Sequence, residues 1–170
     1  MSFLVNPYWF AVAECTESII SNKTTGTTTY ISSPANASII GTKILSGNSL
    51  IGESLNELTF NVKRDAGTSG NIVIGRVPNS VTDGSFASTM VTEAVGDNIG
   101  TSYADVTFSG TGGTIAANDI LGIKFTGSGG DIDVSVNDAT PNMANQEIRY
   151  LDGTTWTNNG YYILGTVCTS

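Results

Sequence analysis

Hydrophobic and polar residues alternate with a period of two along several stretches of the chain. This alternation is typical of antiparallel strands that bury one face and leave the other in water. The polar positions of three such stretches predict wet faces, at Thr59, Asn61 and Lys63, at Gly122 and Lys124, and at Asp131, Asp133 and Ser135. The hydrophobic positions, with two from a further run, predict the core: Leu58, Phe60, Val62, Ile72, Ile74, Leu121, Ile123, Phe125, Ile132 and Val134.

Other short runs rich in β-branched residues are separated by Gly, Asn and Asp, the residues that tight turns prefer. They predict further strands at Thr27–Ser32, Ile39–Leu45, Asn71–Val77, Thr89–Val95, Ala104–Phe108, Glu147–Leu151 and Tyr161–Val167. No stretch has a convincing helical period. The pattern therefore predicts an all-β fold, a two-sheet antiparallel jelly-roll-like sandwich of about 8–10 strands.

The composition narrows the function classes. The chain has 170 residues, which suits one domain, and a net charge of −8. A surface of that sign repels phosphate backbones and anionic lipid heads, so we expect neither nucleic acid nor a membrane as a partner. The absence of His excludes Ser-His-Asp and Cys-His catalysis and imidazole metal ligands. We therefore expect no enzymatic activity and no cofactor.

The first residues differ from the rest. Seven large apolar residues fall in the ten positions Phe3–Val12, and the loose, Thr-rich stretch Ser21–Thr29 follows. This leader is either the first strand of its own sandwich or an arm that packs on a neighbouring subunit, and Pro7 argues against a central strand. We divide the chain into an arm or first strand with its tether, residues 1–35, and a sandwich, residues 36–170. The expected oligomer contacts are Phe3, Leu4, Tyr8, Trp9 and Phe10.

The two cysteines lie near opposite ends of the chain, at Cys15 and Cys168. The first and last strands of a sandwich are often neighbours, so a disulfide would tie the termini together. The alternative is a pair of separate buried thiols, as in many cytoplasmic proteins.

Two further groups of residues suggest ligands. Asp131, Asp133 and Asp138 offer oxygen atoms to Ca²⁺, but the run lacks the Gly and the bidentate Glu of an EF-hand. The alternative is that these carboxylates only solvate a strand.

The second group is aromatic and could stack on a sugar ring, with asparagine amides as hydrogen-bonding partners. The alternative is that its tryptophan caps the core beside a hairpin. The residues of this expected glycan contact are Tyr150, Trp156, Asn158 and Tyr161.

The order of strands resembles two kinds of known protein. The segments that show it are Leu58–Val62, Gly70–Arg76, Val106–Phe108, Thr114–Phe125 and Tyr150–Trp156. They resemble the jelly rolls of carbohydrate-binding modules and of viral and phage surface proteins, and the leader Phe3–Trp9 is similar to the openings of phage and environmental-virus structural proteins. Neither resemblance brings a fixed catalytic or ligand pattern.

Two function classes follow. The first is a structural virion protein, a capsid decoration, tail or fibre component that binds itself and other proteins of the particle. It would be assembled in the host cytoplasm and displayed on the virion surface. The second is a carbohydrate-binding module or an extracellular filament or adhesin subunit that contacts surface glycans. The apolar leader and the lack of a secretory signal favour the first.

Overall fold

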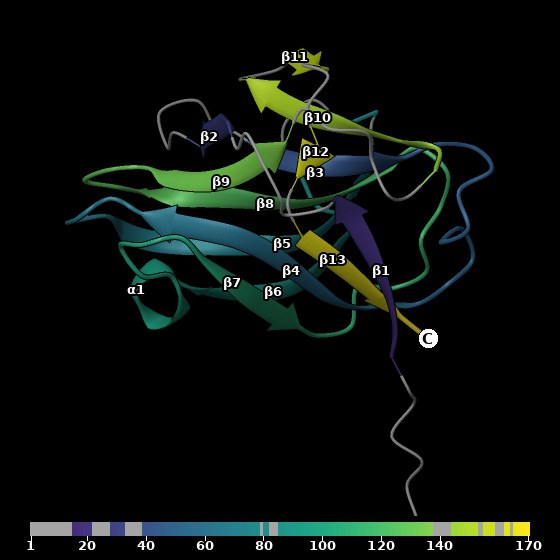
Figure 1. The fold of residues 1–170 in the computed structure, drawn as a ribbon, viewed down its shortest axis with the longest axis horizontal. Helices are drawn as coiled ribbons and strands as arrows, with labels where there is room; N and C mark the ends of the chain where they lie inside the picture. The colour runs from purple at the N-terminus through teal and green to yellow at the C-terminus, as the bar shows by residue number, and fades with distance from the viewer. Residues whose placement is uncertain are drawn as a thin grey trace, which may run out of the picture.

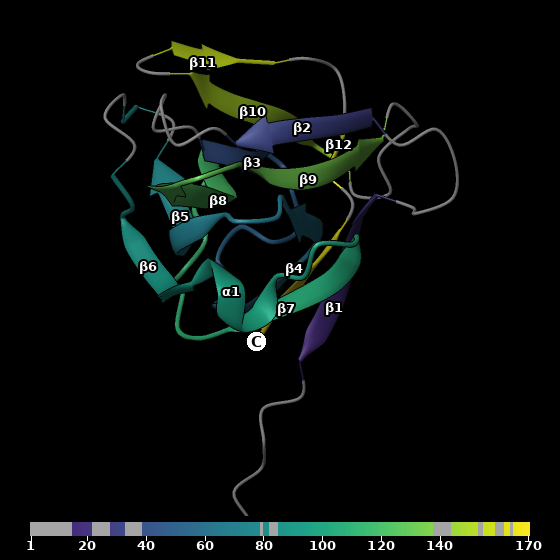
Figure 2. The same cartoon turned by 90° about the vertical axis from the view of Figure 1, so that its left-hand side faces the viewer.

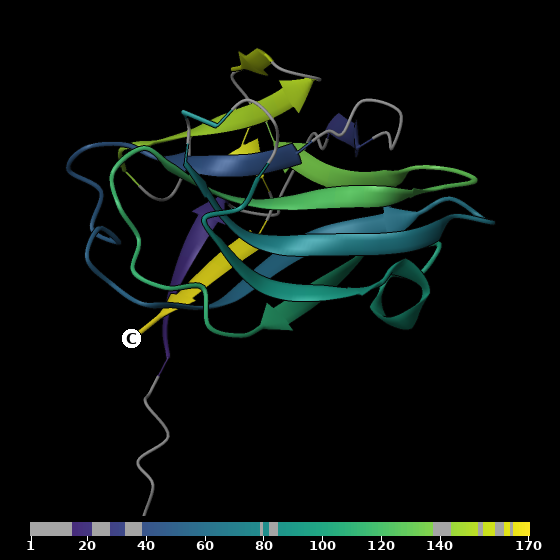
Figure 3. The ribbon, with the colours of Figure 1, turned by 180° about the vertical axis from the view of Figure 1, so that it is seen from behind.

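The fold is described from a computed structural model, for residues 15–21, 28–32, 39–78, 80–81, 85–137, 144–152, 155–158, 162–163 and 165–170. Two antiparallel sheets pack face to face (Figures 1 and 3). Sheet A contains β1 (Thr16–Ser21), β13 (Gly165–Thr169), β4 (Leu55–Arg64), β9 (Ile132–Asn137) and β12 (Tyr162–Ile163), with β2 (Thr28–Ser32) on β9 and β7 (Ala104–Ser109) on β4. Sheet B has the order β11 (Thr155–Thr157), β10 (Gln146–Asp152), β3 (Ile39–Ile44), β8 (Asp119–Ser128), β5 (Ser69–Pro78) and β6 (Ser88–Ala94).

The all-β, two-sheet architecture expected from the alternation is confirmed. Strands β1 and β11 were not predicted, and the last predicted strand is divided between β12 and β13. One helical turn, α1 (Val95–Asn98), joins β6 to β7 and so passes from sheet B to sheet A (Figure 2).

The sandwich begins earlier than the expected boundary at residue 36. β1 pairs with β13, from Thr16 opposite Thr169 to Ser21 opposite Gly165. All residues of β2 pair with β9. Figure 1 shows β1 beside β13, next to the C-terminus. The strand predicted at Thr27–Ser32 is therefore present as β2, although the division at residue 36 had grouped it with the leader.

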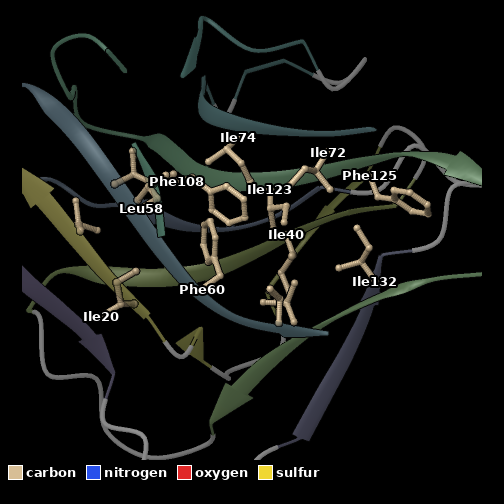
Figure 4. Close-up of a cluster of buried hydrophobic side chains, with 14 of the residues drawn as sticks. Ile20, Ile40, Leu58, Phe60, Ile72, Ile74, Phe108, Ile123, Phe125 and Ile132 are labelled. Carbon is tan, nitrogen blue, oxygen red and sulfur yellow. The ribbon is translucent and has the colours of Figure 1, made fainter. Parts of the chain in front are cut away.

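The core lies between the sheets (Figure 4). Each of the ten residues predicted for it is at most 1% exposed, so this prediction is confirmed. Both sheets contribute, and Phe60 of β4 packs against Phe108 of β7 with ring centroids 6.3 Å apart. Ile20 of β1 also enters this cluster, which makes β1 part of the sandwich in packing as well as in pairing.

Some positions expected on wet faces are buried instead: Asn61, Gly122, Asp133 and Ser135. On sheet A the burial is compensated by polar contacts, because Lys63 pairs with Asp133 at 2.9 Å and Ser135 donates a hydrogen bond to Asn61 at 2.7 Å. On sheet B, Gly122 lies under a second apolar layer. The alternation was therefore right about which side faces the core and wrong about how wet the other side is.

This second layer covers the outer face of sheet B. Ile39, Val77 and Ile120 are fully buried there, with Val81, Phe86 and Trp156 packed against them. Between them, three glycines stand in register across β3, β8 and β5, at Gly41, Gly122 and Gly75. A Cβ on Gly122 would lie 2.8 Å from the Ile40 carbonyl oxygen and 3.2 Å from Ile39 Cγ2, so the glycine makes room for the layer above it.

Candidate functional site

The outer face of sheet A carries a row of polar side chains across four neighbouring strands. Glu17 of β1 and Glu57 of β4 stand directly opposite Cys168 of β13, and Ser109 of β7 stands opposite Glu57. Directly opposite residues project from the same face of a sheet. The register of four strands thus gathers two carboxylates, a sulfur and a hydroxyl at one end of the outer face.

Cys15 joins this row by a disulfide to Cys168, with Cα atoms 5.5 Å apart and a sequence separation of 153. Of the two alternatives for the cysteines, the structure has the bonded one. The bond fixes the residue that precedes β1 to the last strand of the chain. Closing a loop of this length stabilises a fold by about 3–5 kcal/mol in the chain-entropy model.

A shallow groove of about 290 Å³ lies over the row. Ser109 donates a hydrogen bond to Glu57 at 3.0 Å, Thr59 and Thr107 share one at 2.8 Å, and Asn61 donates to Asp105 at 2.9 Å. The groove therefore presents oriented oxygen atoms and negative charge. It is lined by Cys15, Glu17, Glu57, Thr59, Asp105, Thr107, Thr166 and Cys168.

Metal-ligating atoms converge in this groove. Among the residues that the structure describes, the Sγ atoms of Cys15 and Cys168 and a carboxylate oxygen of Glu57 all lie within 4.8 Å of one another. Neither Glu17 nor Glu57 was predicted as a site residue. The period of two places Glu57 on the polar side of β4, but only the strand register brings it to Cys168.

The residues expected to bind calcium are arranged differently. Lys63 donates a hydrogen bond to Asp133, and this bond together with the negative charge of Asp133 raises the pKa of Lys63. Burial raises the pKa of Asp131, and the nearby charges of Asp65 and Asp133 raise it further. Asp138 lies outside the described residues. The structure thus gives Asp133 a partner within the protein, and the converging group of three described ligands is the one with the cysteines.

Of the four expected glycan contacts, two have partners within the protein and the side chains of the other two lie outside the described part of the structure. Trp156 packs on the outer layer of sheet B and donates its indole N–H to the Val81 carbonyl at 2.7 Å. Asn158 donates its amide to Glu147 at 2.9 Å. Tyr161 and the side chain of Tyr150 lie outside the described residues. Trp156 therefore packs against the outer layer of sheet B, as expected for a cap, and its contact with a glycan stays a prediction.

A second, larger hollow of about 500 Å³ lies beside the loop that leads into β8, lined by Pro78, Ser80, Ala117, Asn118 and Asp119. The buried carboxylate in this hollow, that of Asp119, already has hydrogen-bonding partners within the protein. Asp119 accepts hydrogen bonds from Arg76 Nη1 at 2.8 Å and from the Ala116 backbone at 2.7 Å. The carboxylate therefore holds the turn before β8 in place.

The leader residues Phe3, Leu4, Tyr8, Trp9 and Phe10 lie outside the described residues. The described surface of the sandwich shows how few apolar side chains an apolar segment could contact on it. Its exposed large hydrophobic residues are Ile51, at 37% exposure, and Tyr103, at 40%. None of the described helices is long and apolar enough to cross a membrane.

Comparisons with family models, with curated proteins and with solved structures found no match to this chain.

Proposed function

We propose that this protein is a non-enzymatic structural component of a virion, such as a capsid decoration, tail or fibre subunit, that acts by self-association and surface display. The observation that supports this most is a contrast within one chain. Seven large apolar residues stand in the leader, whereas the described surface of the sandwich exposes only two large hydrophobic side chains.

The contrast has an energetic consequence. Burying a large apolar side chain stabilises by about 1.5–3 kcal/mol relative to leaving it in water. Seven such residues in ten positions would be a strong driving force for association if they met a partner surface. The described part of the sandwich offers them little apolar surface, so the partner we propose is the apolar leader of a second copy of the chain.

The point at which the leader joins the sandwich is fixed. Cys15 is bonded to Cys168, and β1 follows at once in sheet A. The 14 residues before Cys15 would reach at most about 50 Å when extended, enough to contact a neighbouring subunit. A rigid attachment favours a defined geometry between subunits, because less freedom is lost when the leader binds.

The test replaces the two aromatic residues that we expect to anchor the contact, in the double variant Trp9→Ser and Phe10→Ser. The matched control replaces the two exposed hydrophobic residues of the sandwich, Ile51→Ser and Tyr103→Ser. Light scattering should find an oligomer for the wild type and the control and a folded monomer for the leader variant. A leader variant that unfolds as a monomer would contradict the proposal, since the leader would then belong to its own core.

A further inference from the structure

We propose that Cys15, Cys168 and Glu57 form a zinc-binding site when the two cysteines are reduced. The same pair of sulfur atoms then acts either as a disulfide or as two metal ligands, depending on the redox state of the surroundings. This proposal does not depend on the structural role proposed above.

The geometry already gathers the ligands. The two sulfurs and the Glu57 carboxylate oxygen lie within 4.8 Å of one another. Ligand atoms on one tetrahedral zinc ion lie about 3.3–3.8 Å apart, given Zn–S distances of about 2.3 Å and Zn–O distances of about 2.0–2.2 Å. Small side-chain movements are therefore enough to place all three on one ion once the S–S bond is gone.

The strand pairing also brings these ligands beside one another. Cys168 and Glu57 are cross-strand partners on β13 and β4, and Cys15 immediately precedes β1, which pairs with β13. Ser109 donates to the Glu57 carboxylate at 3.0 Å, a contact that orients it from the next strand. The site is thus supported from four neighbouring strands.

The set of ligands suits zinc. Thiolate sulfur and carboxylate oxygen are both common zinc ligands, and three protein ligands leave the fourth position to water. The groove is open enough for that water, and Cys15 is exposed. Glu17 lies opposite Cys168 on the other side and adds negative charge near the ion.

Opening the disulfide takes two electrons and two protons from two external thiols, which are oxidised to a disulfide, and leaves two protein thiols. The zinc-binding step that follows needs no oxidant or reductant. Two S–H bonds break, two Zn–S bonds form, and two protons leave for solvent, so zinc binding involves no electron transfer. Two thiolates beside Glu57 and Glu17 would repel one another, and a divalent cation removes that repulsion. In the disulfide each sulfur is bonded to the other, and neither is a thiolate. Disulfide and zinc therefore exclude one another, and each ties the start of β1 to β13.

The experiment titrates the full chain with Co²⁺ under anaerobic conditions, after reduction by a phosphine, and then adds Zn²⁺ in competition. The reduced wild type should bind one Co²⁺ with a thiolate-to-cobalt charge-transfer band, and Zn²⁺ should abolish that band. The oxidised wild type should show no band. A reduced, folded wild type without the band would overturn the proposal.

Two variants test individual ligands, and a third is the control. Cys15→Ser should lose the band of a two-thiolate site, and it is the safer cysteine to replace because it is exposed. Glu57→Gln should weaken cobalt binding at least roughly tenfold, the loss expected even for an outer partner of a metal site. Glu53→Gln, an exposed carboxylate elsewhere, should change nothing. Equal affinity in Glu57→Gln and the wild type would overturn the three-ligand site.

Far-ultraviolet circular dichroism of the reduced chain, which reports its β-strands, is recorded before and after each metal addition. A reduced chain that loses this signal and regains it with Zn²⁺ supports the proposal, because the metal then replaces the disulfide. A reduced chain that stays unfolded with Zn²⁺ present overturns it.

Discussion

The two sheets bury their inner faces alike, but their outer faces differ. On sheet A the outer face is polar, with Glu17, Glu57 and their neighbours around an open groove beside the disulfide. On sheet B the outer face is apolar at Ile39 and Ile120 and is covered by Phe86 and Trp156. One face is therefore available for contacts with other molecules, while the other has become a second, smaller core.

The difference is visible in the strands themselves. From Glu57 to Lys63, β4 alternates between polar and apolar residues, as expected for a strand with one face on the core. β3 begins with Ile39 and Ile40 in succession, and all six of its residues are buried. A strand covered on both sides has no wet face to display, so its sequence loses the alternation.

The largest expected effect concerns the shared core. Phe60→Ala should lower the free energy of unfolding by about 3–5 kcal/mol, because a fully buried ring loses both transfer energy and packing. Thr59→Ala, the next position on the same strand, faces outward and should cost less than about 1 kcal/mol. Urea unfolding of both variants measures the difference. Equal losses would mean that the two faces of β4 have been assigned wrongly.

The glycine row tests whether sheet B is truly covered. Gly122→Ala should destabilise by about 1–3 kcal/mol, because the new Cβ meets the Ile40 carbonyl oxygen and Ile39 Cγ2. Gly96→Ala is the matched control, since a Cβ there meets nothing within 4 Å. Thermal or urea unfolding decides. A Gly122→Ala variant as stable as the wild type would show that this face yields easily.

Much of the core could be predicted from the sequence, and much of the site could not. Period-two alternation identified Phe60 and Ile123 because burial on one side is a local property of a strand. The layer over Ile39 depends on Phe86 and Trp156 returning from distant parts of the chain, which no local pattern encodes. The meeting of Glu57 with the two cysteines depends on the register of β1, β13 and β4 in the same way.

A smaller effect is expected for the cap on sheet B. Trp156→Phe removes the indole N–H that binds the Val81 carbonyl at 2.7 Å but keeps most of the apolar contact. The loss should be about 1 kcal/mol, the usual net value of one hydrogen bond. Chemical unfolding of the variant provides the number. An unchanged stability combined with lost binding to a glycan array would instead make Trp156 a sugar contact.

The smallest effect concerns charge near the β9 end of sheet A. Burial and the charges of Asp65 and Asp133 raise the pKa of Asp131, so folding disfavours its charged form. The favourable contribution of the Asp131 carboxyl to the free energy of unfolding is present below its ordinary pKa of about 3.9. This contribution is lost as the pH rises through the higher pKa of the folded state. Asp131→Asn should therefore stabilise at neutral pH by only about 0.5 kcal/mol, because solvent screens the charges.

The pH dependence is the check on this prediction. The stabilisation by Asp131→Asn should disappear near about pH 3, where the carboxyl is protonated in both states. Asp97→Asn, at an exposed carboxylate on α1, is the control and should leave the stability unchanged at both values. A stabilisation that persists in acid would point to a cause other than charge.

We propose that the polar sandwich associates with copies of itself through its apolar leader. Sedimentation equilibrium of the unaltered chain over a range of concentrations tests it most directly, because it reports the mass in solution without any substitution. Self-association through the leader predicts a single closed homo-oligomer that persists on dilution to micromolar concentration. A soluble, folded monomer of 17.7 kDa across that range would contradict it.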